Sequence, residues 1–220
     1  MKNVTYYPDN YEFDCGKHFV GKVKDCKTNI SVEDTDTLGA ARKFENACCL
    51  NFASHKRPGG GYKSVIDIPA PIKTQEEDLF RRSANLIELM DNQEVRKFYP
   101  LKNTDALYTS DILINKDQRL NKVESFYINL ITVPAVVNPQ PEHEELVKRK
   151  VKRILDIAAY QEQRDLILGA WGCGIFNNDP QTIANLFKNY LQNEFSGYFC
   201  NVVFAIPGGR NLEIFKESLV

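Results

Sequence analysis

The sequence predicts an α/β fold in which a mainly parallel, mixed sheet is covered by helices on both faces. Short apolar runs rich in β-forming residues alternate along the chain with longer segments of helical periodicity. Such alternation is typical of parallel strands joined by crossover helices. The chain has 220 residues, 43% of them hydrophobic, which suffices for one substantial core. We therefore expect residues 1–220 to form a single domain.

Five segments are expected to be buried strands, because each is a short apolar run with β-branched or aromatic residues. In chain order they are Ala47–Ala53, Asp111–Ile114, Phe126–Val133, Leu166–Ala170 and Val202–Ile206. Four further segments have the period of a helix: Thr35–Phe44, Gln75–Met90, Glu142–Gln161 and Pro180–Phe195. The last of these has a defined start, since Asp179 can cap it and proline suits the first helical position.

The charge balance and the first residues exclude some classes of partner. The 28 Lys and Arg residues balance 29 Asp and Glu residues, so no general nucleic-acid binding is expected. Residues 1–15 contain no apolar run, which argues against a secretory leader or a membrane span there. We expect a soluble, cytoplasmic monomer without a membrane partner. The basic run Lys148–Arg153 could bind phosphate backbones, but it falls in an amphipathic helix, where a solvated face is the favoured interpretation.

The cysteines form no C-x-x-C pair, and only three His accompany them, so no metal site is expected. We expect all of them to be reduced: Cys15, Cys26, Cys48, Cys49, Cys173 and Cys200. The adjacent pair lies inside an apolar run and is expected to be buried as small hydrophobic side chains. The sequence calls for no cofactor.

Two glycine-rich segments follow predicted strands. One is Gly59–Gly61, after Pro58, and the other is Gly172–Gly174, directly after Trp171. In an open α/β sheet, ligands bind beyond the carboxyl ends of the strands. Glycine lets backbone N–H groups approach a phosphate closely. The two segments together therefore favour a diphosphate ligand, although each could also be a tight turn without one.

Four segments taken in order carry a family resemblance. They are Asn51-Phe52-Ala53-Ser54, Pro58-Gly59-Gly60-Gly61, Gln75-Glu76-Glu77 and Gly169 through Pro180. With these segments the chain resembles the microbial type of poly(ADP-ribose) glycohydrolase (PARG), a branch of the macrodomain superfamily, over about Thr35 to Ile206. The resemblance implies a three-layer α/β/α macrodomain-like fold with its core at about 35–206. It also implies that the partner is ADP-ribose or poly(ADP-ribose) on modified macromolecules, which the enzyme releases by hydrolysis.

The resemblance also implies roles for individual residues. Glu77 is the catalytic acid and then base, and Glu76 orients the ribose hydroxyls. Asn51 hydrogen-bonds the distal ribose, and Phe176 lies near the adenine or the proximal ribose. The remaining expected substrate-binding residues are Gly59, Gly60, Gly61, Gln75, Gly172, Cys173, Gly174 and Ile175. The chemistry fits, because cleaving an O-glycosidic bond needs a proton for the departing oxygen.

Other interpretations of the same residues stay open. The segment Thr74–Glu77 fits a capping box, in which Glu77 bonds the backbone N–H of Thr74 and has no catalytic role. The protein would then be an ADP-ribose reader without activity. The chain also departs from the family between the glycine triplet and Gln75, where the loop Tyr62–Thr74 is longer than the family's compact connection.

Overall fold

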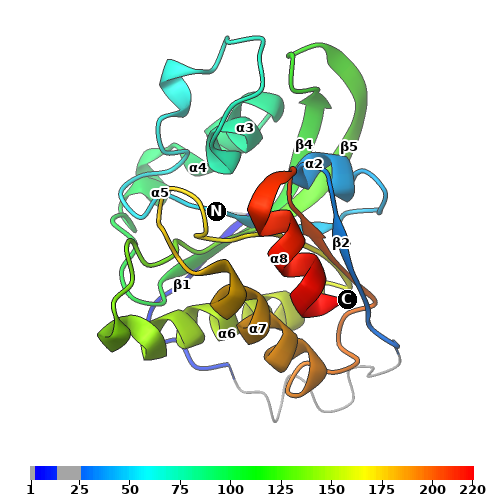
Figure 1. The fold of residues 1–220 in the computed structure, drawn as a ribbon. Helices are drawn as coiled ribbons and strands as arrows, with labels where there is room; N and C mark the ends of the chain where they lie inside the picture. The colour runs from blue at the N-terminus through cyan, green and yellow to red at the C-terminus, as the bar shows by residue number, and fades with distance from the viewer. Residues whose placement is uncertain (1–2, 14–25) are drawn as a thin grey trace.

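The computed structural model describes residues 3–13 and 26–220. Its strands form one seven-stranded sheet in the order β1-β4-β5-β3-β6-β7-β2 (Figure 1). The strands are β1 (Val4–Tyr7), β2 (Asn29–Glu33), β3 (Cys48–Asn51), β4 (Ala106–Lys116), β5 (Lys122–Thr132), β6 (Asp165–Leu168) and β7 (Asn201–Ala205). All pairs from β5 to β2 are parallel, whereas β1–β4 and β4–β5 are antiparallel. The predicted mixed and mainly parallel sheet is confirmed.

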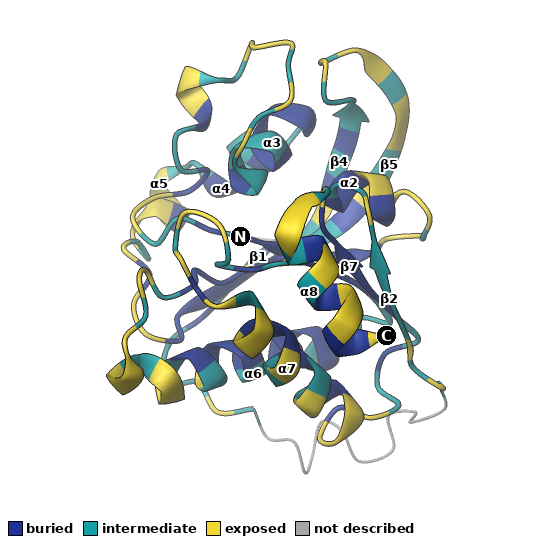
Figure 2. Ribbon diagram, in the orientation of Figure 1, coloured by how far each residue is buried: buried dark blue, intermediate teal, exposed yellow. Residues whose placement is uncertain are grey.

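Helices cover both faces of this sheet. On one face lie α6 (Glu144–Tyr160), α7 (Pro180–Gln192) and α8 (Gly209–Leu219), and on the other lie α2 (Thr37–Ala41), α3 (Gln75–Arg82) and α4 (Leu86–Met90). Shorter elements are α5 (Gln93–Arg96) and the 3-10 turns η1 (Tyr62–Ser64) and η2 (Pro141–His143). Figure 2 shows the helices with buried sides toward the sheet and exposed sides away from it. The three-layer α/β/α arrangement is therefore confirmed.

The central strands β3, β6 and β7 are largely apolar because both of their faces are covered. In β3, Cys48 and Leu50 belong to the core under α6, α7 and α8, and Cys49 belongs to the core under α2, α3 and α4. Successive side chains of a strand point to opposite faces, so a strand between two helical layers needs apolar residues at every position. This is why the short apolar runs predicted the central strands well.

The predicted helix Gln75–Met90 is wrong in its length. It consists of α3 and α4, which are separated at Ser83, where the backbone is extended (φ −90°, ψ 153°). Ser83 forms an isolated antiparallel bridge with Ile114 of β4, and the N–H of Ala84 bonds the carbonyl of Leu113. The helix thus ends because its backbone groups are bonded to a strand far away in the sequence.

Strand β4 is longer than the sequence indicated, and several outer elements were not predicted. The predicted strand Asp111–Ile114 is the middle of the eleven-residue β4, whose register with β5 shifts between Thr109 and Ile112. The sheet edges β1 and β2 and the helix α8 were not predicted. No helix within residues 3–13 and 26–220 is long and apolar enough to cross a membrane.

The expectation that every cysteine is reduced is wrong for one pair. Cys26 and Cys200 form a disulfide with their Cα atoms 5.0 Å apart. They lie just before the neighbouring parallel strands β2 and β7, which brings them together despite a sequence separation of 174. The other cysteines in the described residues, Cys48, Cys49 and Cys173, are free. Cys15 lies outside the described residues.

Candidate active site

The carboxyl ends of the central strands meet at one edge of the sheet. There β3 ends at Asn51, which pairs in register with Thr132 at the end of β5. The loops that follow β3 and β6 carry the two glycine-rich segments and start from this same edge. Asn51 is fully buried, and its amide nitrogen donates to the hydroxyl of Thr132 at 3.3 Å. Its amide oxygen is buried without a hydrogen-bond partner in the protein.

Glu76 links the end of β3 to the glycine loop, which contains Gly59–Gly61. One of its oxygens accepts from the Asn51 amide at 3.2 Å and from the N–H of Gly59 at 3.1 Å, and the other accepts from the N–H of Ser54 at 2.8 Å. The residue is only 4% exposed. Burial raises the pKa of Glu76 to about 7, because the three donors only partly offset the loss of solvation and the nearby Glu77 adds to the rise.

Glu77 contacts the glycine triplet as well. Its Oε1 atom accepts a hydrogen bond from the N–H of Gly61 at 3.1 Å. A Cβ built on Gly61 would lie 2.6 Å from this oxygen, so a side chain there would displace the carboxyl from this position. Thr74 precedes the helix but makes no side-chain capping bond, and its hydroxyl is buried without a partner. The capping-box interpretation of Thr74–Glu77 is therefore wrong.

Gln75 fixes the start of α3 to the end of β3. Its amide oxygen accepts from the N–H of Phe52 at 2.9 Å, and its nitrogen donates to the carbonyl of Leu50 at 2.8 Å and to the hydroxyl of Thr37 at 3.1 Å. Gln75 therefore satisfies the backbone groups on either side of Asn51, much as a neighbouring strand would. These hydrogen bonds of Gln75 set the direction in which the side chains of Glu76 and Glu77 point from α3.

The long loop Tyr62–Thr74 is held by a buried arginine. Arg81 is fully buried and donates to the carbonyls of Ile68 and Ala70 within the loop, the latter at 2.8 Å. It also bonds the carbonyl of Gln118 at the β4–β5 turn and forms an ion pair with Asp78 at 2.9 Å. Arg81 thus attaches the long loop to α3 and to the β4–β5 turn. Because its guanidinium is bonded to these groups, it does not pair with Glu77.

The loop that follows β6 and contains Trp171, the tryptophan loop, is held in place by side-chain hydrogen bonds. Trp171 is buried and donates from its ring N–H to the carbonyl of Val133 at 2.9 Å. The side-chain nitrogen of Asn178 donates to the carbonyls of Val136 (2.8 Å), Gly172 (3.1 Å) and Phe176 (3.3 Å). Asn178 therefore folds residues 172–177 into a compact turn. Its role depends on contacts across the loop, so the sequence alone gave no reason to single it out.

The expected binding residues on this loop differ in exposure. Ile175 is 78% exposed, whereas Phe176 and Cys173 are half-buried and pack against the core. Burial raises the pKa of the Cys173 thiol to about 12, so the thiol stays protonated. Gly172 has a φ of 76°, and a Cβ there would lie 2.7 Å from both Ala135 and Asn178. The glycine is required by the turn itself.

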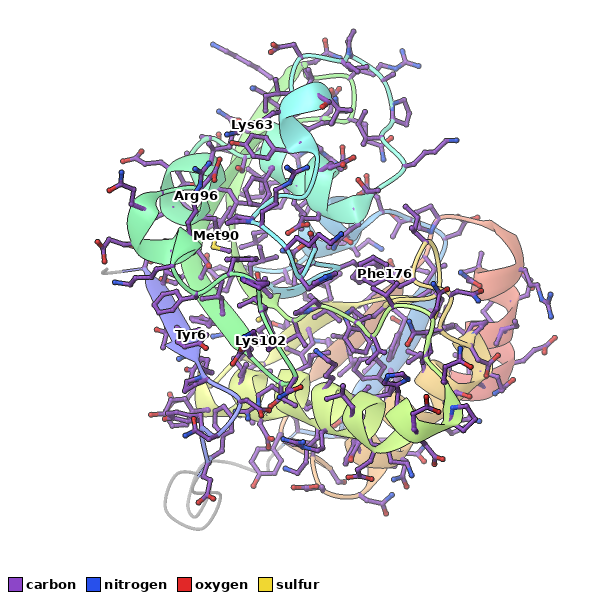
Figure 3. All side chains as sticks on the ribbon, turned by 90° about the vertical axis from the view of Figure 1, so that its left-hand side faces the viewer. Tyr6, Lys63, Met90, Arg96, Lys102 and Phe176 are labelled. Atoms are coloured by element: carbon purple, nitrogen blue, oxygen red, sulfur yellow. A yellow bond between two sulfur atoms is a disulfide. The ribbon has the colours of Figure 1, made fainter. Side chains whose placement is uncertain are left out.

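A cleft of about 640 Å³ opens beside these loops. Gln75 and Gly174 line it among the expected residues, together with Phe52 at the end of β3. The segment after β7 forms another wall that was not predicted from the sequence, made of Ile206, Pro207, Gly208, Gly209, Arg210 and Asn211. Gly60 and Gly61 line a second cavity of about 490 Å³, which shares no lining residue with the first. Figure 3 shows Phe176 on the side of the tryptophan loop, apart from Lys63 and Arg96 of that second cavity.

The basic run Lys148–Arg153 is only in part the solvated face that was expected, because Arg149 is exposed whereas Lys150 and Arg153 are buried. Lys150 and Arg153 are 4% and 7% exposed. Lys150 donates to the carbonyl of Pro134 at 2.8 Å, and burial lowers its pKa to about 8. The other cations of the run bond carboxylates or carbonyls: Lys148 with Glu144, Arg149 with Asp9, Lys152 with Asp156 and Glu194, and Arg153 with Tyr11 and Asp9. The run therefore stabilises the fold and offers no continuous basic surface.

Comparisons with known proteins agree with this geometry. Residues 1–117 match the family described as "Microbial-type PARG, catalytic domain". The PARG of Deinococcus radiodurans in complex with ADP-ribose is 28% identical, with a TM-score of 0.84 over 99% of this chain and 94% of that chain. The PARG of Thermomonospora curvata is 27% identical, with a TM-score of 0.82 over 99% and 86%. The same enzyme bound to the inhibitor ADP-HPD gives 0.80 at 27% identity over 98% and 85%. None of the curated proteins matches the chain.

Proposed function

The chain belongs to the family of microbial-type PARG catalytic domains, and from this membership we propose that it hydrolyses the ribose–ribose O-glycosidic bonds of poly(ADP-ribose) or related ADP-ribosyl linkages. It is a glycosidase, and its relatives of known structure bind ADP-ribose or the inhibitor ADP-HPD. The likeness to these relatives extends over nearly the whole chain and includes both glycine-rich segments.

One observation carries the proposal. Glu77 turns its carboxylate toward the glycine triplet and accepts a hydrogen bond from Gly61, although a helix cap was open to it. A glycosidase that acts on a ribosyl diphosphate needs its acid close to the loop that binds the phosphates, and the Glu77 carboxyl lies beside a loop of this type.

The reaction follows from this carboxyl. The Glu77 proton moves to the leaving oxygen while the bond between that oxygen and C1 of the ribose breaks. Water then adds its oxygen to C1 and gives its proton to the Glu77 carboxylate, which restores the acid. The products are ADP-ribose and a free hydroxyl on the shortened substrate. Breaking and making the bond are separate steps, so one carboxyl can serve both as acid and as base.

Glu76 has a positioning role in this proposal. Both of its oxygens accept hydrogen bonds from the protein, and these fix Asn51, Ser54 and Gly59 relative to one another. The unpaired amide oxygen of Asn51 is left to accept a hydrogen bond from a ribose hydroxyl. An unsatisfied buried acceptor costs free energy, which a ligand donor would recover.

ADP-ribose is proposed to occupy the cleft of about 640 Å³ and to extend from it to the glycine triplet, which does not itself line the cleft. Its diphosphate would lie between Gly59–Gly61 and Gly172–Gly174, and Phe176 would offer an aromatic surface to the adenine or the proximal ribose. The chain is proposed to act as a single-domain monomer without general nucleic-acid binding. In support, the large exposed hydrophobic side chains among the described residues are few: Ile68, Tyr127, Val137, Ile175 and Val220. The cytoplasmic location stays a prediction.

A parallel turnover assay tests the proposed function. The purified chain is incubated with poly(ADP-ribosyl)ated and with mono-ADP-ribosylated protein, and released ADP-ribose is measured for the wild type and for Glu77→Gln. We expect release by the wild type and a loss of at least about a hundredfold in the variant. Binding of ADP-ribose, measured by calorimetry, should persist in both. Binding by the wild type without release from either substrate would make the protein a reader.

A further inference from the structure

The second cavity, of about 490 Å³, borders the glycine triplet Gly59–Gly61 and shares no lining residue with the proposed ADP-ribose cleft. Gly60 and Gly61 form part of its wall. A Cβ built on either glycine would lie within 4 Å of a Glu77 oxygen. The triplet therefore forms part of the wall of this cavity, with the proposed acid beside it. Whatever leaves the ribose when the glycosidic bond breaks must depart on the side away from the bound ADP-ribose.

The cavity is strongly basic. Lys56, Arg57, Lys63 and Arg96 line it, with Asp91 as the single acid in its lining. Figure 3 shows Lys63 and Arg96 close together on this side of the molecule, and both form ion pairs with Asp91, at 3.2 and 2.5 Å. Burial alone would raise the pKa of Asp91, but hydrogen bonds from Arg96, Tyr62 and Lys63 lower it to about 2. One charged carboxylate thus faces four cations, and an excess of positive charge is left for a ligand.

A neutral donor completes the lining. The hydroxyl of Tyr99 is buried and has no hydrogen-bond partner in the protein. Burial raises its pKa, and the nearby carboxylates of Glu76 and Asp91 raise it further, so the group stays protonated. A buried O–H without an acceptor is costly, and an anionic oxygen entering the cavity would satisfy it.

We propose that this cavity binds the diphosphate of the ADP-ribose unit that leaves when a poly(ADP-ribose) chain is cut. The inference rests on the proposed function. In the polymer, the hydroxyl released by cleavage belongs to a ribose that carries its own diphosphate on the 5′ carbon. On the leaving side of the scissile bond, a second diphosphate is therefore attached to the first sugar. A mono-ADP-ribosylated side chain brings no such group, so the cavity favours polymer over single units.

The polymer suits the cavity better than a modified nucleic acid does. A nucleic-acid strand needs a basic path that extends over several phosphates. The other basic segment, Lys148–Arg153, is occupied by internal ion pairs and carbonyl contacts. Of these two basic segments, only the cavity of about 490 Å³ keeps an excess of positive charge in one hollow.

The test removes two exposed cations from the cavity. The double variant Lys56→Ala/Lys63→Ala is compared with Lys97→Ala/Lys102→Ala, which loses the same charge at exposed positions outside the cavity. The substrates are a dimer of ADP-ribose and ADP-ribose joined to a neutral aryl alcohol. We expect kcat/KM for the dimer to fall about tenfold in the cavity variant only, and kcat/KM for the aryl substrate to change less than about twofold.

A binding measurement keeps the inference separate from turnover. In the Glu77→Gln background, the cavity variant should bind the dimer about tenfold more weakly and ADP-ribose equally well. Equal losses for the dimer and the aryl substrate, or no loss for the dimer, would overturn the inference while leaving the glycosidase intact. A loss seen only with an ADP-ribosylated oligonucleotide would overturn it in favour of a nucleic-acid leaving group. Absence of turnover on every substrate by the wild type would instead remove the proposed function.

Discussion

The backbone N–H of Gly61 lies 3.1 Å from a Glu77 oxygen, and a methyl group at Gly61 would come within 2.6 Å of that same atom. The loop that is expected to hold a phosphate therefore also sets the position of the proposed acid. Gly61 has an ordinary negative φ of −99°, so the need for glycine comes from this contact and not from the backbone conformation.

Gly61→Ala should impair turnover more than stability. The new methyl group displaces the Glu77 carboxyl, and a shift of about 1 Å costs on the order of a hundredfold in rate. Because the backbone conformation suits alanine, the free energy of unfolding should change by less than about 1 kcal/mol. Release of ADP-ribose and urea denaturation measure the two effects. Unchanged turnover in a folded variant would show that the contact has no catalytic consequence.

Gly59→Ala, in the same triplet, should give the opposite balance. Gly59 has a φ of 71°, and a Cβ there would lie 2.5 Å from the ring of Tyr62 and 2.7 Å from that of Phe80. Backbone strain and overpacking together should lower the free energy of unfolding by about 2–4 kcal/mol. Urea denaturation next to Gly61→Ala provides the comparison, and equal stability of the two variants would contradict the structure.

Thr74→Val tests whether a capping box supports α3. The Thr74 hydroxyl is buried without a partner, so its replacement should leave stability unchanged or raise it by up to about 1 kcal/mol. Asp179→Ala is the control, because Asp179 caps α7 by accepting from the N–H of Thr182 at 2.8 Å. That change should cost about 1 kcal/mol. A similar loss at Thr74, measured by thermal or urea unfolding, would restore the capping interpretation.

Arg81→Met should loosen the loop Tyr62–Thr74. The change leaves the carbonyls of Ile68, Ala70 and Gln118 without their donor and is expected to cost about 3 kcal/mol. Urea denaturation measures the loss, and limited proteolysis should show new cleavage within residues 62–74. Arg119→Met, at the exposed β4–β5 turn, serves as the control and should leave both readouts unchanged.

Glu76 should make stability depend on pH near neutrality. Its pKa is about 7 in the folded protein and 4.5 when unperturbed, so between these values the folded state binds more protons than the unfolded state. The contribution of Glu76 to stability is full below pH 4.5 and is lost as the pH rises through 7. Relative to Glu76→Gln, the wild type should lose up to about 3 kcal/mol across this window. Urea unfolding of both proteins at pH 4.5, 6 and 8 tests this, and parallel pH profiles would contradict it.

The sequence by itself determined the central architecture. Apolar runs such as Leu166–Ala170 predicted β6 because a strand covered on both faces must be apolar at successive positions. The cap at Asp179 and the two glycine-rich segments could also be predicted, since each depends on residues that are near one another in the chain. The edge strands β1 and β2 escaped prediction because an edge strand is only partly covered and shows no continuous apolar run.

Only the tertiary structure decided how individual charged side chains are used. Glu77 could bond its own helix start or the loop sixteen residues away, and the choice of Gly61 over Thr74 depends on how α3 packs beside β3. Likewise Arg81 and Lys150 look like exposed helix cations in sequence but are buried by partners in distant segments. The local sequence pattern determines which helix or strand carries a side chain. Its contacts are determined by the groups that the fold brings within hydrogen-bond distance.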